Sequence, residues 1–354
     1  MVKLSKENQI KDVVLAVTYQ CNAHCQFCHI WQNQERFSLL PNDYRILPRN
    51  LKNINISGGE PFLRNDLTEI VRAVVRRCPK AKIIISTNGF LPSAIKRQMQ
   101  DIVKFKMDIG IAVSLDGFGK VHEDLRGYPG GFSLVLETIR LLKNLNIKDL
   151  KLAFTLNDKN LNQLKRVYKL SKELGVEFSL AACHDSSHYF KKENNQIENT
   201  SQAGNQLDWL IKKELSSFSP KKWLRAYFAY ALVHFLKTKQ RILPDYSGVS
   251  SLFIDPFGKI YPSDVWDLKI GDLSDIRSWD AFAAKTEAAI LSREKDRPAS
   301  WMICTVRQAM KKHWLEVGWW IIRNKFLFPK NYYWQTKDSS RGSLRSYLAR
   351  LARS

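Results

Sequence analysis

Three of the six cysteines of this chain lie close together, as Cys21, Cys25 and Cys28 in a C-x3-C-x2-C spacing. They follow an apolar, β-branched run over residues 13–17, which predicts a strand. Three thiolates on a short loop at the end of a strand can hold an iron–sulfur cluster by three of its irons and leave the fourth iron open to a ligand. The alternative is a zinc site in which His24 or His29 supplies the fourth ligand.

The elements that must position this loop alternate between strands and helices. Apolar, β-branched runs predict strands over 13–17, 53–57, 82–86, 109–115, 150–156 and 176–182. Apolar side chains at helical spacing predict helices over 66–77, 92–101, 131–145 and 160–174. This alternation favours an α/β fold with a parallel sheet and right-handed crossovers.

Polar or glycine-containing turns follow the later strands. Because ligands bind at the carboxyl ends of strands in folds of this kind, these turns should surround one mouth together with the cysteine loop. The residues concerned are Gly58, Gly59, Glu60, Thr87, Asn88, Ser114, Asp116, Thr155, Asn157, Cys183 and His184. Capping of strand ends is an alternative explanation for the polar side chains, as an ordinary tight turn is for the glycine pair.

The order of these motifs resembles the radical S-adenosylmethionine (SAM) superfamily. A C-x3-C-x2-C loop follows the first strand, Gly-Gly-Glu-Pro the second and Ser-x-Asp-Gly the fourth, and the resemblance covers roughly residues 10–185. It implies a partial (β/α)6 barrel of the TIM type in which Cys21, Cys25 and Cys28 bind a [4Fe-4S] cluster. It also implies that SAM chelates the open iron, and that reduction of the cluster cleaves SAM to a 5′-deoxyadenosyl radical that abstracts hydrogen from a substrate. A low-potential donor such as flavodoxin or ferredoxin would supply the electron.

The resemblance also implies which residues contact SAM. The Gly58-Gly59 pair lets the backbone approach a ligand closely because it lacks Cβ atoms. Glu60, or the carbonyls beside it, can accept hydrogen bonds from the amino group of SAM. Asn88 and Ser114 can bond a ribose or a carboxylate, and Phe27 is an apolar neighbour that can shield the cluster.

The second half of the chain is similar to the SPASM/twitch extension of radical SAM enzymes, with a predicted β-hairpin that turns at residues 255–258. Ser247, Ser263 and Ser300 stand where that extension carries cysteines, and only Cys304 remains. Serine hydroxyls stay protonated at neutral pH and one thiolate cannot anchor a cluster, so we expect the auxiliary cluster to be lost and the extension to shape the substrate pocket.

The expected organisation has four parts. A radical SAM core spans residues 1–200, and a helical linker spans 201–240. A small α+β twitch/SPASM-like extension spans 241–310, and a basic, aromatic tail spans 311–354.

The formal net charge of +22 predicts an anionic partner. The tail interleaves aromatic and basic side chains, and Leu344, Tyr347, Leu348 and Leu351 fall at helical spacing. We expect contact with an acidic membrane in preference to nucleic acid. A helix packed on the barrel with a solvated basic face explains the pattern as well.

The expected compartment is the cytoplasm, with membrane association through the tail. The first nine residues show no apolar core of a signal peptide. The longest apolar stretch, 226–236, is shorter than the roughly 20 residues that a bilayer requires. The scattered Cys78, Cys183 and Cys304 form no disulfide framework.

The sequence therefore predicts a radical SAM enzyme with one cluster, acting on an anionic small molecule or a peptide. The alternative is a non-catalytic, metal-stabilised binding protein that docks on nucleic acid or acidic membrane through its tail. A third hypothesis is a radical SAM relative that keeps the cluster and has lost turnover.

Overall fold

The computed structural model describes residues 10–33 and 38–327. Its centre is one nine-stranded sheet with the strand order β6-β5-β4-β3-β2-β1-β7-β8-β9. The first six strands are mutually parallel, as the alternation of elements predicts. They are β1 (Asp12–Ala16), β2 (Asn53–Ser57), β3 (Lys82–Thr87), β4 (Gly110–Ser114), β5 (Asp149–Leu156) and β6 (Glu177–Ala182).

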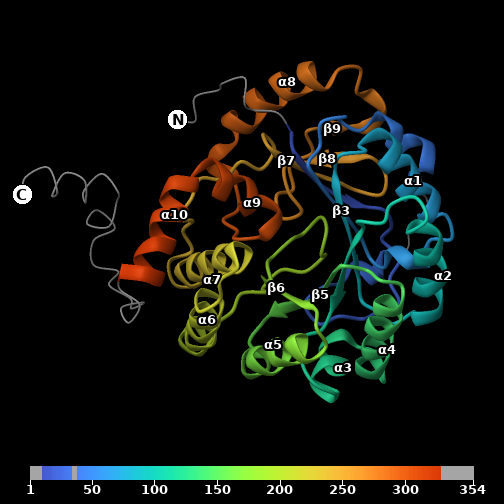
Figure 1. The fold of residues 1–354 in the computed structure, drawn as a ribbon. Helices are drawn as coiled ribbons and strands as arrows, with labels where there is room; N and C mark the ends of the chain where they lie inside the picture. Colours follow the sequence, from blue (N-terminus) through green and yellow to red (C-terminus); the bar gives the residue numbers. More distant parts are fainter. Residues whose placement is uncertain (1–9, 34–37, 328–354) are drawn as a thin grey trace, which may run out of the picture.

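Helices connect these strands and form the outer layer of a partial barrel (Figure 1). They are α1 (Leu67–Arg77), α2 (Pro92–Ile102), α3 (Lys120–Arg126), α4 (Gly131–Asn144) and α5 (Leu164–Glu173). The helix α3 was not predicted from the sequence, because it is seven residues long, mostly polar and bounded by Gly119 and Gly127.

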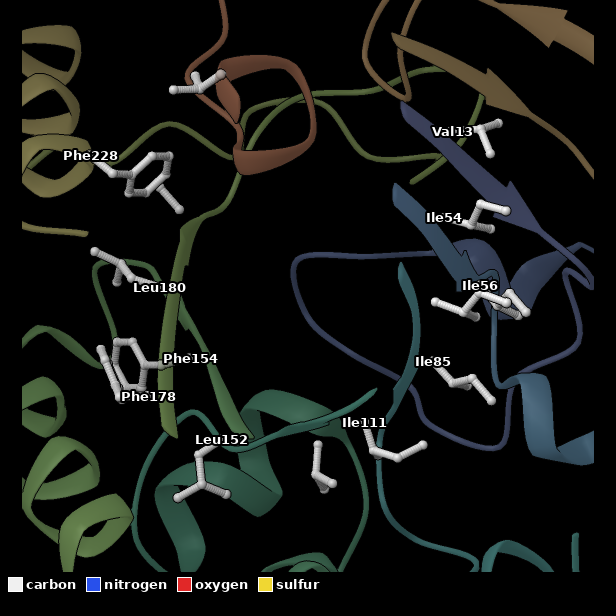
Figure 2. Packing of buried hydrophobic residues seen from close by; sticks show 14 of the residues in the cluster. Val13, Ile54, Ile56, Ile85, Ile111, Leu152, Phe154, Phe178, Leu180 and Phe228 are labelled. Atoms are coloured by element: carbon white, nitrogen blue, oxygen red, sulfur yellow. The ribbon is translucent and has the colours of Figure 1, made fainter. Parts of the chain in front are cut away.

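The strands carry two different faces, as expected for side chains that alternate along a strand. One set is fully buried and includes Ile54, Ile56, Ile85 and Ile111, which Figure 2 shows in the apolar cluster. The other set is small or polar and only half-buried, and it comprises Asn55, Ser57, Ser86, Ser114, Thr155 and Ser179. The interior of the barrel is therefore accessible rather than packed shut.

The second half extends the same sheet. β7 (Ser251–Ile254) pairs parallel with β1, and β8 (Lys259–Tyr261) returns antiparallel to β7. The predicted hairpin with its turn at 255–258 is thus confirmed. β9 (Gly271–Asp272) completes the sheet. The strands of the expected extension, which was to begin at residue 241, therefore belong to the same sheet as the strands of the core.

Most of the remaining helices gather beside the open edge at β6, whereas α8 (Trp279–Ser292) lies near β9 (Figure 1). Those beside β6 are α6 (Thr200–Leu215), α7 (Pro220–Thr238), α9 (Ile303–Lys312) and α10 (Trp314–Ile322), and a π-helical turn (Arg323–Leu327) ends the described chain. Within residues 10–33 and 38–327, no helix has both the length and the apolarity that crossing a membrane demands. The predicted apolar spacing at Leu344, Tyr347, Leu348 and Leu351 lies outside the described residues.

Candidate active site

The three clustered cysteines lie on the loop that follows β1, and their side chains are close together. Burial raises the pKa of Cys21 to about 12, and the charge of Cys25 raises it further. Burial also raises the pKa of Cys28, with further increases from Cys25 and Cys21. The three sulfur atoms therefore share one site, in which Cys25 is buried and Cys21 and Cys28 are half-buried. In the part of the chain that the structure describes, no group of three or more His, Cys, Asp or Glu side chains surrounds a single metal-ion position.

The two histidines that a zinc site would recruit have other neighbours. The ring of His24 packs edge-on against Trp31 at a centroid distance of 4.6 Å. His29 packs against the same indole at 6.1 Å, and its backbone N–H donates to the carbonyl of Phe190.

Arg126, at the end of α3, is a buried cation beside the cysteines. Its Nη1 lies 3.8 Å from Cys25 Sγ, and its Nε donates to Asp116 Oδ2 at 2.6 Å. Its guanidinium lies over the ring of Phe27 at 5.1 Å. Burial raises the pKa of the Cys25 thiol, and Arg126 opposes this rise, so the arginine favours the thiolate that an iron ligand requires.

Gly58 and Gly59 contact the cysteine loop itself. A Cβ on Gly58, whose φ is +137°, would lie 2.3 Å from the carbonyl oxygen of Thr18, and a Cβ on Gly59 would lie 2.1 Å from that of Gln20. The backbone N–H groups of Gly59 and Glu60 donate to these same two carbonyls at 2.7 and 2.8 Å. The close approach expected toward a ligand is thus an approach of the glycine turn to the cysteine loop.

Glu60 is fully buried, and its carboxylate accepts hydrogen bonds from within the protein. Oε1 accepts from Phe62 N and Thr87 Oγ1, and Oε2 accepts from Asn88 N at 2.7 Å. Burial raises the pKa of Glu60 to about 7, although these donors oppose the shift. The side chain thereby ties the β2 turn to the end of β3, which makes it a positioning residue for the backbone around it.

Asn88 connects the same turn to the cysteines. Its Nδ2 donates to Asn22 Oδ1 at 2.7 Å, and its Oδ1 accepts from Phe90 N. The Nδ2 of Asn22 is buried and has no hydrogen-bond partner in the described residues. A buried donor without a partner costs about 1–3 kcal/mol, so this amide is available to a bound group.

Ser114 and Phe27 occupy two sides of the site. Ser114 is half-buried at the carboxyl end of β4, on the same face as Ala112, which lines the barrel cavity. Phe27 is partly buried against the core, and its carbonyl accepts from Asn195 Nδ2 at 2.9 Å. Asn195 also donates to the carbonyl of His184, so the loop after β6 closes over the cysteine loop.

A cavity of about 620 Å³ occupies the barrel interior. Small side chains of the strands line it, including Ser86, Ala112, Thr155 and Ser179. Asp264, which follows the hairpin, lies in its wall and is fully buried, and burial raises the pKa of this carboxyl to about 6. The cavity therefore extends from Ser86 and Thr155, near the carboxyl ends of β3 and β5, to the extension.

Ser247, Ser263 and Ser300, the positions where the SPASM/twitch resemblance led us to expect cysteines, are all buried. Ser247 Oγ accepts from Arg297 at 3.2 Å, and the carbonyl of Ser300 accepts from Arg241 at 2.6 Å. Cys304 Sγ lies 3.8 Å from Asp264 Oδ1. Arginine–carboxylate and arginine–serine contacts thus hold this part of the extension together.

Four residues of the site were not predicted from the sequence, namely Arg126, Asn22, Asn195 and Asp264. Arg126 lies in the one core helix that the sequence did not predict, and Asn22 lies between the cysteines with no spacing that distinguishes it. Asn195 is in a polar loop. Asp264 directly follows Ser263, one of the positions where a cysteine was expected, and that neighbourhood was the one signal that could have identified it.

The residues present fit a [4Fe-4S] cluster with SAM. Three thiols share one site, a cation favours their ionisation, and an unpartnered amide lies beside them. These groups stand at the carboxyl ends of parallel strands, and the same barrel holds a cavity large enough for a small molecule.

Comparison with curated proteins identifies relatives that match about half of the chain. A probable GTP 3',8-cyclase of Metallosphaera sedula is 31% identical over 176 residues, which are 48% of this chain and 54% of that protein. The corresponding protein of Saccharolobus solfataricus is 28% identical over 183 residues, covering 49% and 58%. The chain thus spans little more than half the length of these relatives.

Two solved structures share the fold. Streptococcus suis SuiB bound to S-adenosylmethionine superposes with a TM-score of 0.58 at 17% identity, over 78% of this chain and 66% of that one. Native anSMEcpe with bound AdoMet superposes with a TM-score of 0.57 at 15% identity, over 89% and 98%.

The family model that matches the chain is that of the radical SAM superfamily, whose members use a [4Fe-4S] cluster and SAM. The match begins inside β1 and runs through the cysteine loop, the glycine turn and the strand ends described above. Residues 15–171 of this chain match that model.

Proposed function

We propose that the chain is a radical SAM enzyme with a single [4Fe-4S] cluster held by Cys21, Cys25 and Cys28. A cluster held there, reduced by an external one-electron donor, would pass that electron to the sulfonium of SAM and so supply the radical chemistry that removes a hydrogen atom from a substrate. The observation that carries the proposal is the group of three neighbouring thiols, at the end of a strand, within the residues that match the radical SAM family model.

Residues around the cysteine loop would have different roles in holding the cluster and SAM. Arg126 favours the thiolate of Cys25 and covers the Phe27 side of the site. Asn22 and Ser114 offer polar groups toward SAM, whereas Asn88 and Glu60 act through the backbone that they fix. The mainly apolar lining of the cavity would leave few partners for water near the place where hydrogen is removed, which limits side reactions of a radical.

Partners follow from the same proposal. Radical SAM enzymes generally take their electron from flavodoxin or ferredoxin, and we propose such a donor here. The degenerate SPASM/twitch-like extension, through Asp264 and its neighbours, forms one wall of the substrate cavity. The names of the curated relatives make GTP a substrate to test, and the structural neighbours make a peptide another.

The test is anaerobic reconstitution with iron and sulfide, followed by reaction with SAM and dithionite. We expect about four irons per chain, visible absorbance from the cluster, and 5′-deoxyadenosine as product, assayed with and without GTP. Cys25→Ala should abolish all three signals. Cys304→Ser is the matched control and should retain the iron content, because only the first cysteine group holds a cluster.

Two other outcomes of this test would favour the two alternative functions. Zinc in place of iron, together with no binding of SAM, would contradict the proposal and support a metal-stabilised binding protein. A normal cluster that yields no 5′-deoxyadenosine would identify a relative without turnover.

A further inference from the structure

One side of the molecule exposes an unusual amount of apolar surface. Ten large hydrophobic side chains are exposed in the described residues, and six of them lie on α7, α9, α10 and the turn after α10. They are Leu224, Ile303, Trp314, Leu315, Ile322 and Phe326, and we call the surface they form the α7–α10 face. Contiguous exposed apolar patches on a protein mark interaction sites.

The helix α10 is apolar on both of its sides. Val317 and Ile321 are buried, and the Trp320 ring packs against Tyr230 at 4.8 Å, which fastens α10 to α7. On the other side Leu315 is 53% exposed and Ile322 is 47% exposed. These two residues are seven apart, and Phe326 follows four later, so they form one stripe along the helix.

The barrel cavity opens in this same face. Its lining includes Leu224 of α7, Ile303 of α9 and Trp314 of α10, which are three of the exposed side chains. Further in, its wall is formed by Phe178, Leu180 and Phe228, and Figure 2 shows these three with Phe228 projecting from α7 toward β6. The cavity thus provides an apolar route from the surface toward Ser86 and Thr155 near the strand ends.

The charge on this part of the chain has one sign. Between Ile303 and Phe326 the described residues include five cations, Arg307, Lys311, Lys312, Arg323 and Lys325, against the single carboxylate of Glu316. Apolar side chains flanked by cations fit the boundary of an anionic bilayer, where aromatic and aliphatic groups enter the acyl region and cations meet phosphates. A nucleic acid would match the charge but would leave the apolar stripe in water.

We propose that the α7–α10 face binds an anionic lipid bilayer and that the substrate is an amphiphile with a long apolar chain. The amphiphile passes from the bilayer into the barrel cavity between α7 and α9, and its chain lies along Phe228 and Leu180. The statement about the substrate rests on the proposed function, whereas the statement about the surface does not.

The surface is tested by flotation of the full-length protein with phosphatidylcholine vesicles that contain or lack phosphatidylglycerol. We expect binding only with phosphatidylglycerol, weakened by salt. The double variant Leu315→Ser/Ile322→Ser should bind about tenfold more weakly or worse, because two aliphatic side chains leave the acyl region. Met107→Ser, at a residue 81% exposed between α2 and β4, is the matched control and should bind as the parent does.

If the protein does not bind the vesicles, or if Leu315→Ser/Ile322→Ser and Met107→Ser weaken vesicle binding equally, the proposal that the α7–α10 face binds a bilayer is wrong. If the protein binds RNA and vesicles do not compete with that binding, the proposal is wrong and the partner of this face is a nucleic acid.

The route is tested with dansylated undecanoic acid, whose fluorescence increases in an apolar cavity. Leu224→Trp narrows the opening and should weaken probe binding about tenfold, whereas Leu291→Trp on α8 should not. If Leu224→Trp and Leu291→Trp bind the probe equally well, the proposed route between α7 and α9 is wrong. Neither assay needs the cluster or SAM, so failure to form 5′-deoxyadenosine would refute the proposed function while leaving these two results to be judged separately.

Discussion

At the scale of single residues, the site depends on a buried ion pair that touches a cysteine. Asp116 is fully buried and accepts from Arg126 and from the backbone N–H of Thr155 at 2.7 Å. Asp116 therefore orients the arginine toward Cys25 and connects β4, β5 and α3. Breaking such a pair by removing one partner is costly, because the other charge is left buried.

Removal of the Arg126 charge should lower the reduction potential of the cluster. In Arg126→Gln we expect a shift on the order of 60 mV to more negative values, equivalent to a tenfold change for a one-electron couple. The reason is that a nearby cation stabilises the reduced, more negative cluster. The measurement is a redox titration followed by electron paramagnetic resonance.

The control for this prediction is Arg126→Gln/Asp116→Asn, which removes both charges together. Its potential should shift less than that of the single variant, and it should retain more cluster. A single variant with full cluster content and the parent potential would contradict the prediction.

At the scale of elements, the cysteine loop is held from two sides. The glycine turn after β2 accommodates Thr18 and Gln20 on one side. On the other side, His24 N and Gln26 N donate to the carbonyls of Arg126 and Leu125, each at 2.9 Å. The loop therefore acquires its shape from backbone contacts to β2 and α3 rather than from its own sequence.

Gly59→Ala should disrupt the loop. Its Cβ would meet the backbone oxygen of Gln20 at 2.1 Å, and backbone cannot move aside as a flexible side chain can. We expect a loss of about 2 kcal/mol or more in unfolding free energy and lower cluster content, measured by urea denaturation and iron analysis. Gly318→Ala on α10, where no atom lies within 4 Å, should be neutral. Parent-like values for both variants would contradict this account.

At the scale of the whole molecule, the extension is joined to the barrel through Trp301 and His184. The Trp301 side chain is fully buried, and its Nε1 donates to the carbonyl of Phe228 at 3.0 Å. The backbone N–H of Trp301 donates to His184 Nε2 at 3.1 Å. The Nδ1 of His184 lies 2.8 Å from the carbonyl of Ala182, so the bonds suit a neutral imidazole protonated at Nδ1.

This contact should make stability depend on pH. Burial lowers the pKa of His184 to about 4, against about 6.5 in an unfolded chain. Below about pH 6.5 the unfolded state binds a proton that the fold excludes, so the contribution is present above that pH and is lost as pH falls toward 4. Between pH 7 and pH 5 the loss is about 2 kcal/mol.

Urea unfolding of the parent and of His184→Gln at both pH values measures this contribution as a difference. On acidification the free energy of unfolding of the variant should fall by about 2 kcal/mol less than that of the parent. The protonation of Asp264 has the opposite effect, but it is present in both proteins and cancels in this difference. His234→Gln, at a half-buried residue on α7, should change the pH dependence much less. Equal pH dependence of parent and His184→Gln would refute the assignment.

The local pattern of the chain was enough to predict the six parallel strands, the hairpin at 255–258 and the grouping of three cysteines. Each is encoded by neighbours in the sequence: β-branched runs, a turn between apolar segments, and thiols within a few residues of one another. The helix α3 was not predicted, because its seven mostly polar residues show no helical spacing of apolar side chains. Arg126, which lies in this helix, was therefore not predicted either.

The sequence by itself therefore determined the kind of domain, the group of cysteines and the positions of the glycine turn and the hairpin, since these follow from short-range spacing. Only the tertiary structure decided what those residues touch. It assigned the glycines to the cysteine loop, turned Glu60 inward, placed Arg126 against Cys25 across 101 positions of sequence, and opened an apolar cavity onto the α7–α10 face. The physical reason is that close approach, burial and cavity shape arise between segments far apart in the chain, and no local pattern records them.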